Sequence, residues 1–82
     1  MKTVTLNRKQ LQTLTAIQRH IAAHGMPPTV RELGPQLRLR SLDSVHDRIR
    51  ALRDAGALVA SSRFSNRTIA PARGVRVVVM YE

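Results

Sequence analysis

Apolar residues recur every three or four positions in the first part of the chain, in the order Leu11, Leu14, Ile17 and Ile21. This spacing places them on one face of a helix. Asn7 and Gln10 form a capping box before it, and Gly25 is suited to stop it. The pattern therefore predicts a helix from about Arg8 to His24.

The second predicted helix is short. Thr29 and Glu32 form another capping box, so this helix begins near Val30. Gly34 and Pro35 follow, and Pro35 removes one helical hydrogen bond and presses on the preceding turn. We expect a short, kinked or split helix, followed by a turn at residues 38–40.

The third predicted helix begins after Ser41 as its N-cap and runs to about Ala55, where Gly56 ends it. Its apolar stripe consists of Val45, Ile49 and Leu52. The side chains expected on the opposite side of this helix are Asp43, Asp47, Arg50 and Asp54.

The rest of the chain favours strands. Residues 57–60 and 67–70 predict a hairpin around a polar turn, and the β-branched run at residues 75–80 predicts a last strand. The expected fold class is mainly α with a small antiparallel sheet: a three-helix winged helix-turn-helix with a β-hairpin wing and an extra C-terminal strand. We divide it into a DNA-binding domain over residues 1–72 and a C-terminal strand or tail over residues 73–82.

The tail strand, Val75–Met80, is apolar on both faces apart from Arg76. This is typical of a strand buried on both sides. Such burial is available in two ways: as a third strand under the wing, or by pairing with another chain at an exposed edge. We favour the second, a homodimer through Val75–Met80 that reads two half-sites about one helical turn, or a multiple of it, apart.

Charge points to a polyanionic partner. The chain carries 14 Lys+Arg against 5 Asp+Glu, a formal net charge of +9, and most of the bases are Arg. The Arg fork fits phosphate and the guanine edge, so nucleic acid is the expected partner. The aromatic residues are one Tyr and one Phe, which argues against a single-strand binder that stacks bases on aromatic rings.

Several other classes are not expected. The chain has no cysteine, so we expect no disulfides. His20 and His24 share a helix face, but no third ligand stands near them and the three histidines do not form a metal set, so we expect no metal. No arrangement of nucleophile and base suggests an enzyme, and no cofactor or small-molecule substrate is expected. No apolar run is long enough for a membrane span, and no signal peptide is present at the start. We expect a protein of the cytoplasm of a prokaryotic cell or phage-infected host, associated with the nucleoid.

One known family unites these features. The matching residues are Leu6, Gln10, Ile17, His20, Ile21, the run Gly25-Met26-Pro27-Pro28-Thr29, Leu37, Arg40-Ser41, Ala51-Leu52 and Gly56. Over roughly residues 6–71 the sequence resembles the N-terminal winged helix-turn-helix domain of the LexA-type SOS repressors. The resemblance implies a sequence-specific regulator of transcription that binds duplex DNA, with repression as its mode.

The sequence departs from this family at four places. They are Gly34-Pro35 in the second helix, the acidic start of the third helix at residues 41–48, a slightly longer wing with Arg63 and Phe64, and the end of the chain. The family continues there into a self-cleaving Ser/Lys protease domain, for which no residues remain. Autoproteolysis is therefore not expected, and the operator sequence is not carried over.

The winged helix-turn-helix places helix 41–55 in the major groove and wing 57–70 against the backbone. The candidates for reading bases are Ser41, Asp43, Ser44, His46, Asp47 and Arg50. The candidates for contacting phosphates, from the turn, the helices and the wing, are Arg31, Arg38, Arg40, Arg48, Arg63 and Arg67. Two alternatives stay open: a winged helix that docks on a partner protein, and an architectural DNA binder without sequence preference.

Overall fold

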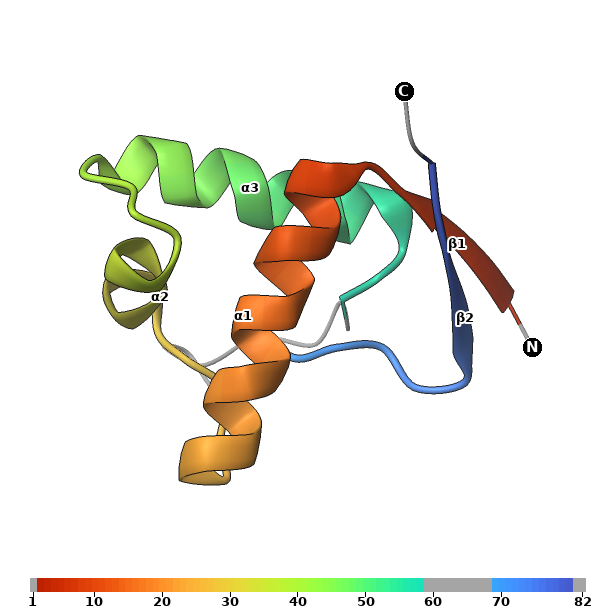
Figure 1. Cartoon of the computed structure of the whole chain (residues 1–82), viewed down its shortest axis with the longest axis horizontal. Coiled ribbons are helices and arrows are strands. Elements are labelled where there is room, and N and C mark those ends of the chain that lie inside the picture. Colours follow the sequence, from red (N-terminus) through yellow and green to blue (C-terminus); the bar gives the residue numbers. More distant parts are fainter. Residues whose placement is uncertain (1, 59–68, 81–82) are drawn as a thin grey trace.

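The computed structural model describes residues 2–58 and 69–80. Along the chain it contains, in order, β1 (Lys2–Leu6), α1 (Arg8–His24), α2 (Val30–Gln36), α3 (Leu42–Ala55) and β2 (Val75–Val79). The two strands lie side by side at one side of the molecule and α2 lies at the other, with α1 and much of α3 between them (Figure 1). The expectation of a mainly helical fold of the winged-helix class is confirmed.

Side chains close the first backbone turns of α1 and α2. The Asn7 side chain accepts from the Gln10 N–H at 2.8 Å, and the Gln10 side chain accepts from the Asn7 N–H at 2.8 Å. Thr29 and Glu32 make the same reciprocal pair at 3.1 and 2.8 Å. Both capping boxes predicted from the sequence are present, and α1 has the bounds that the sequence predicts.

The second helix ends one residue after Pro35, as the sequence predicts for a short helix. The Leu39 N–H bonds to the Gly34 carbonyl at 3.0 Å, and the Arg38 N–H bonds to the Pro35 carbonyl at 3.1 Å. This pair of bonds is a Schellman motif, which places one residue in the left-handed region. That residue is Arg38, with φ of 58°. The turn between α2 and α3 is therefore tight.

Gly34 lies where α2 packs against α3 and the turn that precedes it. A Cβ added there would stand 3.4 Å from the Leu39 carbonyl oxygen and 3.4 Å from Cγ2 of Val45. A single methyl group would therefore just touch α3, whereas a larger side chain would press against it.

The core takes side chains from β1, the three helices and the segments that follow α2 and α3, and Val75 of β2 packs against it while only partly buried. Its buried members are Val4, Leu6, Leu14, Ile17, Leu33, Leu37, Val45, Ile49, Leu52, Ala57, Leu58 and Ile69. The whole predicted stripe of α3 is among them, whereas Leu11 and Ile21 of the α1 stripe are only partly buried. Because α3 buries this stripe, its opposite side faces solvent.

The sheet corrects the sequence-based expectation. An antiparallel sheet was expected, but β1 and β2 pair in parallel, with Lys2 opposite Val75 and Leu6 opposite Val79. The strand β1 was not predicted at all. Parallel neighbours need a long crossover, and here it is the whole segment from α1 to residue 74. The pairing therefore joins the two ends of the chain and leaves no short-range signal.

An antiparallel contact is present at the base of the predicted wing. Leu58 and Pro71 form an isolated bridge, and the Ala72 N–H bonds to the Ala57 carbonyl at 2.9 Å. The rest of the predicted hairpin, residues 59–68, lies outside the described residues. The tail strand does not join this base, since it pairs with β1 of its own chain.

Candidate nucleic-acid interface

The start of α3 is an open helix end. Ser41 is its N-cap, and the Ser41 Oγ accepts from the Asp43 N–H at 3.2 Å. Both residues are exposed. Since the Ser41 hydroxyl proton is not used by that bond, the same group can donate to a phosphate or a base edge.

The side of α3 that faces away from the core carries most of the predicted base-reading residues. Asp43, His46, Asp47 and Arg50 are all exposed. An Asp47 Oδ1 lies 3.8 Å from an Arg50 Nη1, and the two side chains are 73% and 71% exposed. An ion pair so open to water is weak. The ion pair can therefore break so that either side chain contacts a ligand. Without a ligand, the pair holds the two side chains near each other.

Ser44 and Arg48 lie on a different side of α3, toward α1. Ser44 is half-buried, and the Arg48 guanidinium donates to the Lys9 carbonyl at 3.5 Å. The Gln10 side chain makes a similar bond to the Ala51 carbonyl at 3.4 Å. This side of α3 packs along the start of α1, so the structure does not bring Ser44 and Arg48 into the row that contains Asp43 and Asp47.

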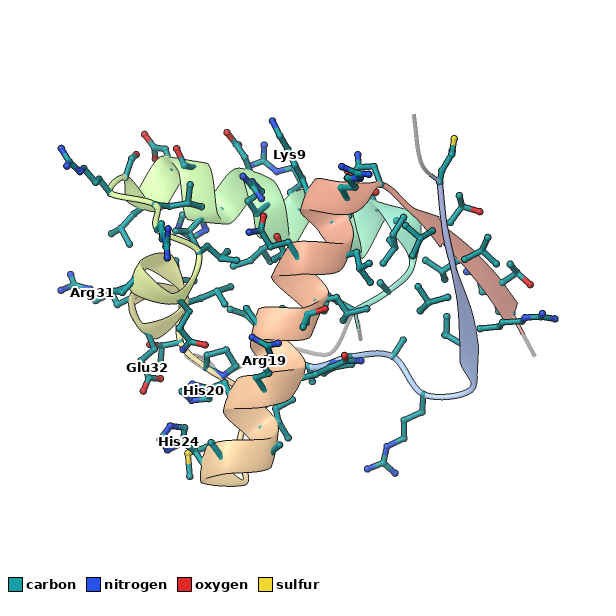
Figure 2. The ribbon with its side chains drawn as sticks, in the orientation of Figure 1. Lys9, Arg19, His20, His24, Arg31 and Glu32 are labelled. Carbon is teal, nitrogen blue, oxygen red and sulfur yellow. The ribbon has the colours of Figure 1, made fainter. Side chains whose placement is uncertain are left out.

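Basic side chains border the start of α3. Arg31, Arg38 and Arg40 are exposed. Arg31 and Arg40 line a shallow hollow of about 400 Å³ between α2 and α3, together with Gly34, Pro35, Leu39, Ser41, Leu42 and Val45. Figure 2 shows Arg31 on the outer side of α2, at the end of the molecule where α3 begins. Three of the four described arginines in the predicted phosphate-contacting set thus gather around the N-terminus of α3.

Two residues that sequence reasoning passed over belong to this surface. Leu42, the first residue of α3, is 45% exposed, so an apolar side chain stands beside Ser41 at the start of the helix. Leu42 is apolar but lies outside the stripe of α3, and this mismatch could have been seen in the sequence. Lys9 is exposed and lies beside α3 (Figure 2). Only the packing of α1 against α3 reveals its position.

The remaining predicted contacts are in the wing. Arg63 and Arg67 lie outside the described residues, so their positions stay predictions. The base of the wing is anchored by the buried residues Leu58 and Ile69, directly after α3.

His20 and His24 lie near the contact between α1 and α2. His20 is buried, and its Nδ1 lies 3.0 Å from the Gln36 Nε2, which links α1 to α2. The rings of His20 and His24 stand 4.4 Å apart. Within residues 2–58 and 69–80 no three side chains of His, Cys, Asp or Glu are grouped to hold a metal. In the same ranges no helix combines the length and apolarity that a membrane crossing needs.

Comparison with known proteins identifies the family. The model of the LexA DNA-binding domain matches residues 1–68. The chain belongs to this family. The resemblance inferred from the GMPPT segment and its flanking residues is thereby confirmed.

Individual LexA repressors are similar to this chain over the same region. That of Anaeromyxobacter dehalogenans (strain 2CP-1) is 37% identical over 71 residues, which are 87% of this chain and 31% of the relative. That of Sorangium cellulosum is 42% identical over 53 residues, or 65% of this chain and 23% of the relative. That of Clavibacter sepedonicus is 43% identical over 54 residues, or 66% and 24%. The chain spans about a third or less of the length of these relatives.

The match to the LexA DNA-binding domain includes β1 and the three helices. It ends at residue 68, before β2 begins at Val75. The tail strand is therefore a feature of this chain beyond the matched family segment.

Proposed function

We propose that this chain is a transcriptional repressor that binds duplex DNA and reads its sequence in the major groove with α3. The observation that carries the proposal is the exposed row Asp43, His46, Asp47 and Arg50, which begins at an open helix N-terminus. Arg31, Arg38 and Arg40 border that N-terminus, where the phosphates on either side of a groove would lie. Membership of the LexA DNA-binding domain family supports the same assignment.

Affinity and specificity come from different residues in this proposal. Three of the five acidic residues of the chain, Asp43, Asp47 and Asp54, are on α3. They repel phosphate, so α3 contributes little general attraction to DNA. A carboxylate can accept from cytosine N4 and discriminate against other bases. Attraction then comes from the arginines around α3, and binding falls steeply as salt rises.

The proposal includes further features of the complex with DNA. The wing, residues 57–70, contacts the backbone through Arg63 and Arg67. Two copies bind as a homodimer to two half-sites, and the protein acts in the cytoplasm on nucleoid DNA. Repression is proposed because the relatives are LexA repressors, and a bound domain can block an operator without any further part.

Selection of bound sequences from a random duplex pool tests the proposal. We expect recovery of one sequence motif, followed by titrations in which its affinity exceeds that of mixed-sequence DNA by at least about a thousandfold at physiological salt. The double variant Asp47→Ala/Arg50→Ala should lose the motif preference and keep mixed-sequence binding. Gln18→Ala, an exposed substitution on α1, is the matched control.

The other outcomes are informative. Absence of any duplex binding at low salt would refute the proposal. Equal affinity for all duplexes would replace it with an architectural DNA binder. A partner-protein function would be favoured if loss of both Arg50 and Arg63 left activity intact while deletion of residues 75–82 abolished it.

A further inference from the structure

The strand β2 has one paired edge and one open edge. The Lys2 N–H bonds to the Gly74 carbonyl at 3.3 Å, and the Met80 N–H bonds to the Leu6 carbonyl at 2.8 Å. Between these bonds the register with β1 is continuous. Backbone groups of successive strand residues point to opposite edges, so those of Val75, Val77 and Val79 point away from β1.

Among residues 2–58 and 69–80 no strand covers this edge, and the strand is mostly apolar. Val77, Val78 and Met80 are 38%, 41% and 58% exposed. Among the described residues β1 is the strand that pairs with β2, and a sheet of only two strands is marginal by itself. Open edges are normally protected by lysine, proline or a bulge. The strand β2 has none of these, and its single charge is Arg76.

We infer that the open edge of β2 pairs antiparallel with the same edge of a second copy of this chain, around a two-fold axis. Two identical edges that run antiparallel satisfy each other, as a symmetric dimer requires. The result is a four-stranded sheet with the order β1, β2, partner β2, partner β1. In Figure 1 the sheet lies on the opposite side of the molecule from α2 and the start of α3. DNA bound at α3 therefore leaves this edge free.

The positions of the open backbone groups restrict the register. Only Val75, Val77 and Val79 can exchange hydrogen bonds with the same three residues of the partner. Full overlap places Val77 opposite the partner's Val77 and Arg76 opposite the partner's Val78. A register centred on Arg76 would set two guanidinium groups directly opposite each other, which is unfavourable. Charge thus selects the register centred on Val77.

The dimer formed in this way is weak. One edge of five residues covers less than the roughly 800 Å² per partner of a stable interface. Two neighbouring half-sites on DNA raise the local concentration of the second copy and strengthen the pair. This consequence rests on the proposed function, whereas the pairing itself is measured without DNA.

Single cysteines test the register in the full chain, because it contains no cysteine. In an antiparallel hydrogen-bonded pair the Cα atoms stand about 5.5 Å apart, within disulfide reach. Val77→Cys should therefore form disulfide dimers under mild oxidation at least tenfold faster than the matched control Arg76→Cys. The two Arg76 positions are diagonal neighbours about 7–8 Å apart and are out of reach. Equal rates, or a faster Arg76→Cys, would overturn the register.

Val77→Pro tests the pairing itself. It removes an N–H from the open edge and leaves the bonds between β1 and β2 in place. Sedimentation without DNA should show a reversible monomer–dimer equilibrium for the wild type and at least tenfold weaker association for this variant, with unchanged helical circular dichroism. A wild type that stays monomeric at every concentration, or a variant that associates like the wild type, refutes the inference.

Failure of the dimer and failure of DNA binding are distinguishable. Val77→Pro should keep the wild-type affinity for a single half-site and lose cooperative binding to an inverted repeat. If the wild type dimerises but binds no duplex, the proposed function is wrong and the edge pairing stands. If it binds half-sites independently and never dimerises, the reverse holds.

Discussion

Arg38 occupies a backbone position that suits glycine better than arginine. Its φ of 58° is in the left-handed region at the end of α2, where a side chain costs about 1 kcal/mol. The side chain is exposed beside the start of α3. A cost to stability at this place is understandable if the guanidinium contacts phosphate.

Arg38→Gly should therefore separate stability from binding. We expect the free energy of unfolding to rise by up to about 1 kcal/mol. DNA affinity should fall, and the slope of log K against log salt should become shallower by about one unit because one phosphate contact is lost. Urea denaturation and salt-dependent anisotropy measure the two effects. Arg40→Gly is the control, since residue 40 has no left-handed backbone and its substitution should not stabilise.

Asp47 is proposed to discriminate between bases and not to attract DNA. Asp47→Asn removes a negative charge from the outer side of α3, so binding to mixed-sequence DNA should strengthen by several-fold while preference for the selected motif falls by 1–3 kcal/mol, as estimated for one base contact. Asp54→Asn removes the same charge near the other end of the helix and should leave the preference unchanged. Competition titrations with the motif and with mixed duplexes compare them. Equal loss of preference in both variants would mean that general charge, and not a base contact, is responsible.

At the scale of elements, α2 packs against α3 at Gly34, which has no side chain. Gly34 brings α2 to within contact of Val45, and a Cβ there would meet two atoms at 3.4 Å. That distance is at the short limit of ordinary packing. One methyl group can be accommodated, and larger side chains would push the two helices apart.

Gly34→Ala and Gly34→Val should consequently differ in sign. Alanine gains up to about 1 kcal/mol from helix propensity, whereas valine should lose about 2 kcal/mol or more through overpacking against α3. Thermal and urea unfolding provide the measurement. A displaced α2 would change the setting of the start of α3, so the valine variant should also bind the motif more weakly. If valine were tolerated as well as alanine, the two helices would not be held at contact distance.

At the scale of the whole molecule, the parallel pair of strands joins the two ends of the chain. Val4 and Leu6 of β1 are 1% and 0% exposed, so β1 belongs to the core. The strand β2 supplies its hydrogen-bonding partner. The sequence led us to treat residues 73–82 as a separate C-terminal segment. In the structure the strand in this segment pairs with β1 of the domain. The division at residue 72 remains a prediction about function.

Removal of residues 75–82 tests how far the domain depends on that pairing. The truncation deletes several backbone hydrogen bonds and exposes part of β1, so the unfolding free energy should fall by an amount on the order of 2–4 kcal/mol. Removal of residues 81–82 alone is the control and should change little. Hydrogen exchange of the β1 amides should rise strongly in the longer truncation only. An unchanged stability would show that residues 75–82 are dispensable for the fold.

Local interactions were readable from the sequence. The caps at Asn7, Thr29 and Ser41, and the apolar stripe of α3, depend on residues within about two turns of each other, so spacing alone predicted the helices and the outer side of α3. The family resemblance implied that the protein binds DNA through the same part of the chain. The short second helix also followed directly from Pro35.

Only the tertiary structure decided how distant segments meet. The alternation of Thr3, Val4, Thr5 and Leu6 was compatible with a strand, but a strand of five residues forms only where a partner exists, and that partner begins at Val75. The position of Arg48 against α1 and the closeness of α2 to α3 at Gly34 are equally non-local. The sequence by itself therefore determined the helices and the side chains exposed on the outer side of α3, whereas the packing of remote segments decided the parallel sheet and the edge of β2 that faces away from β1.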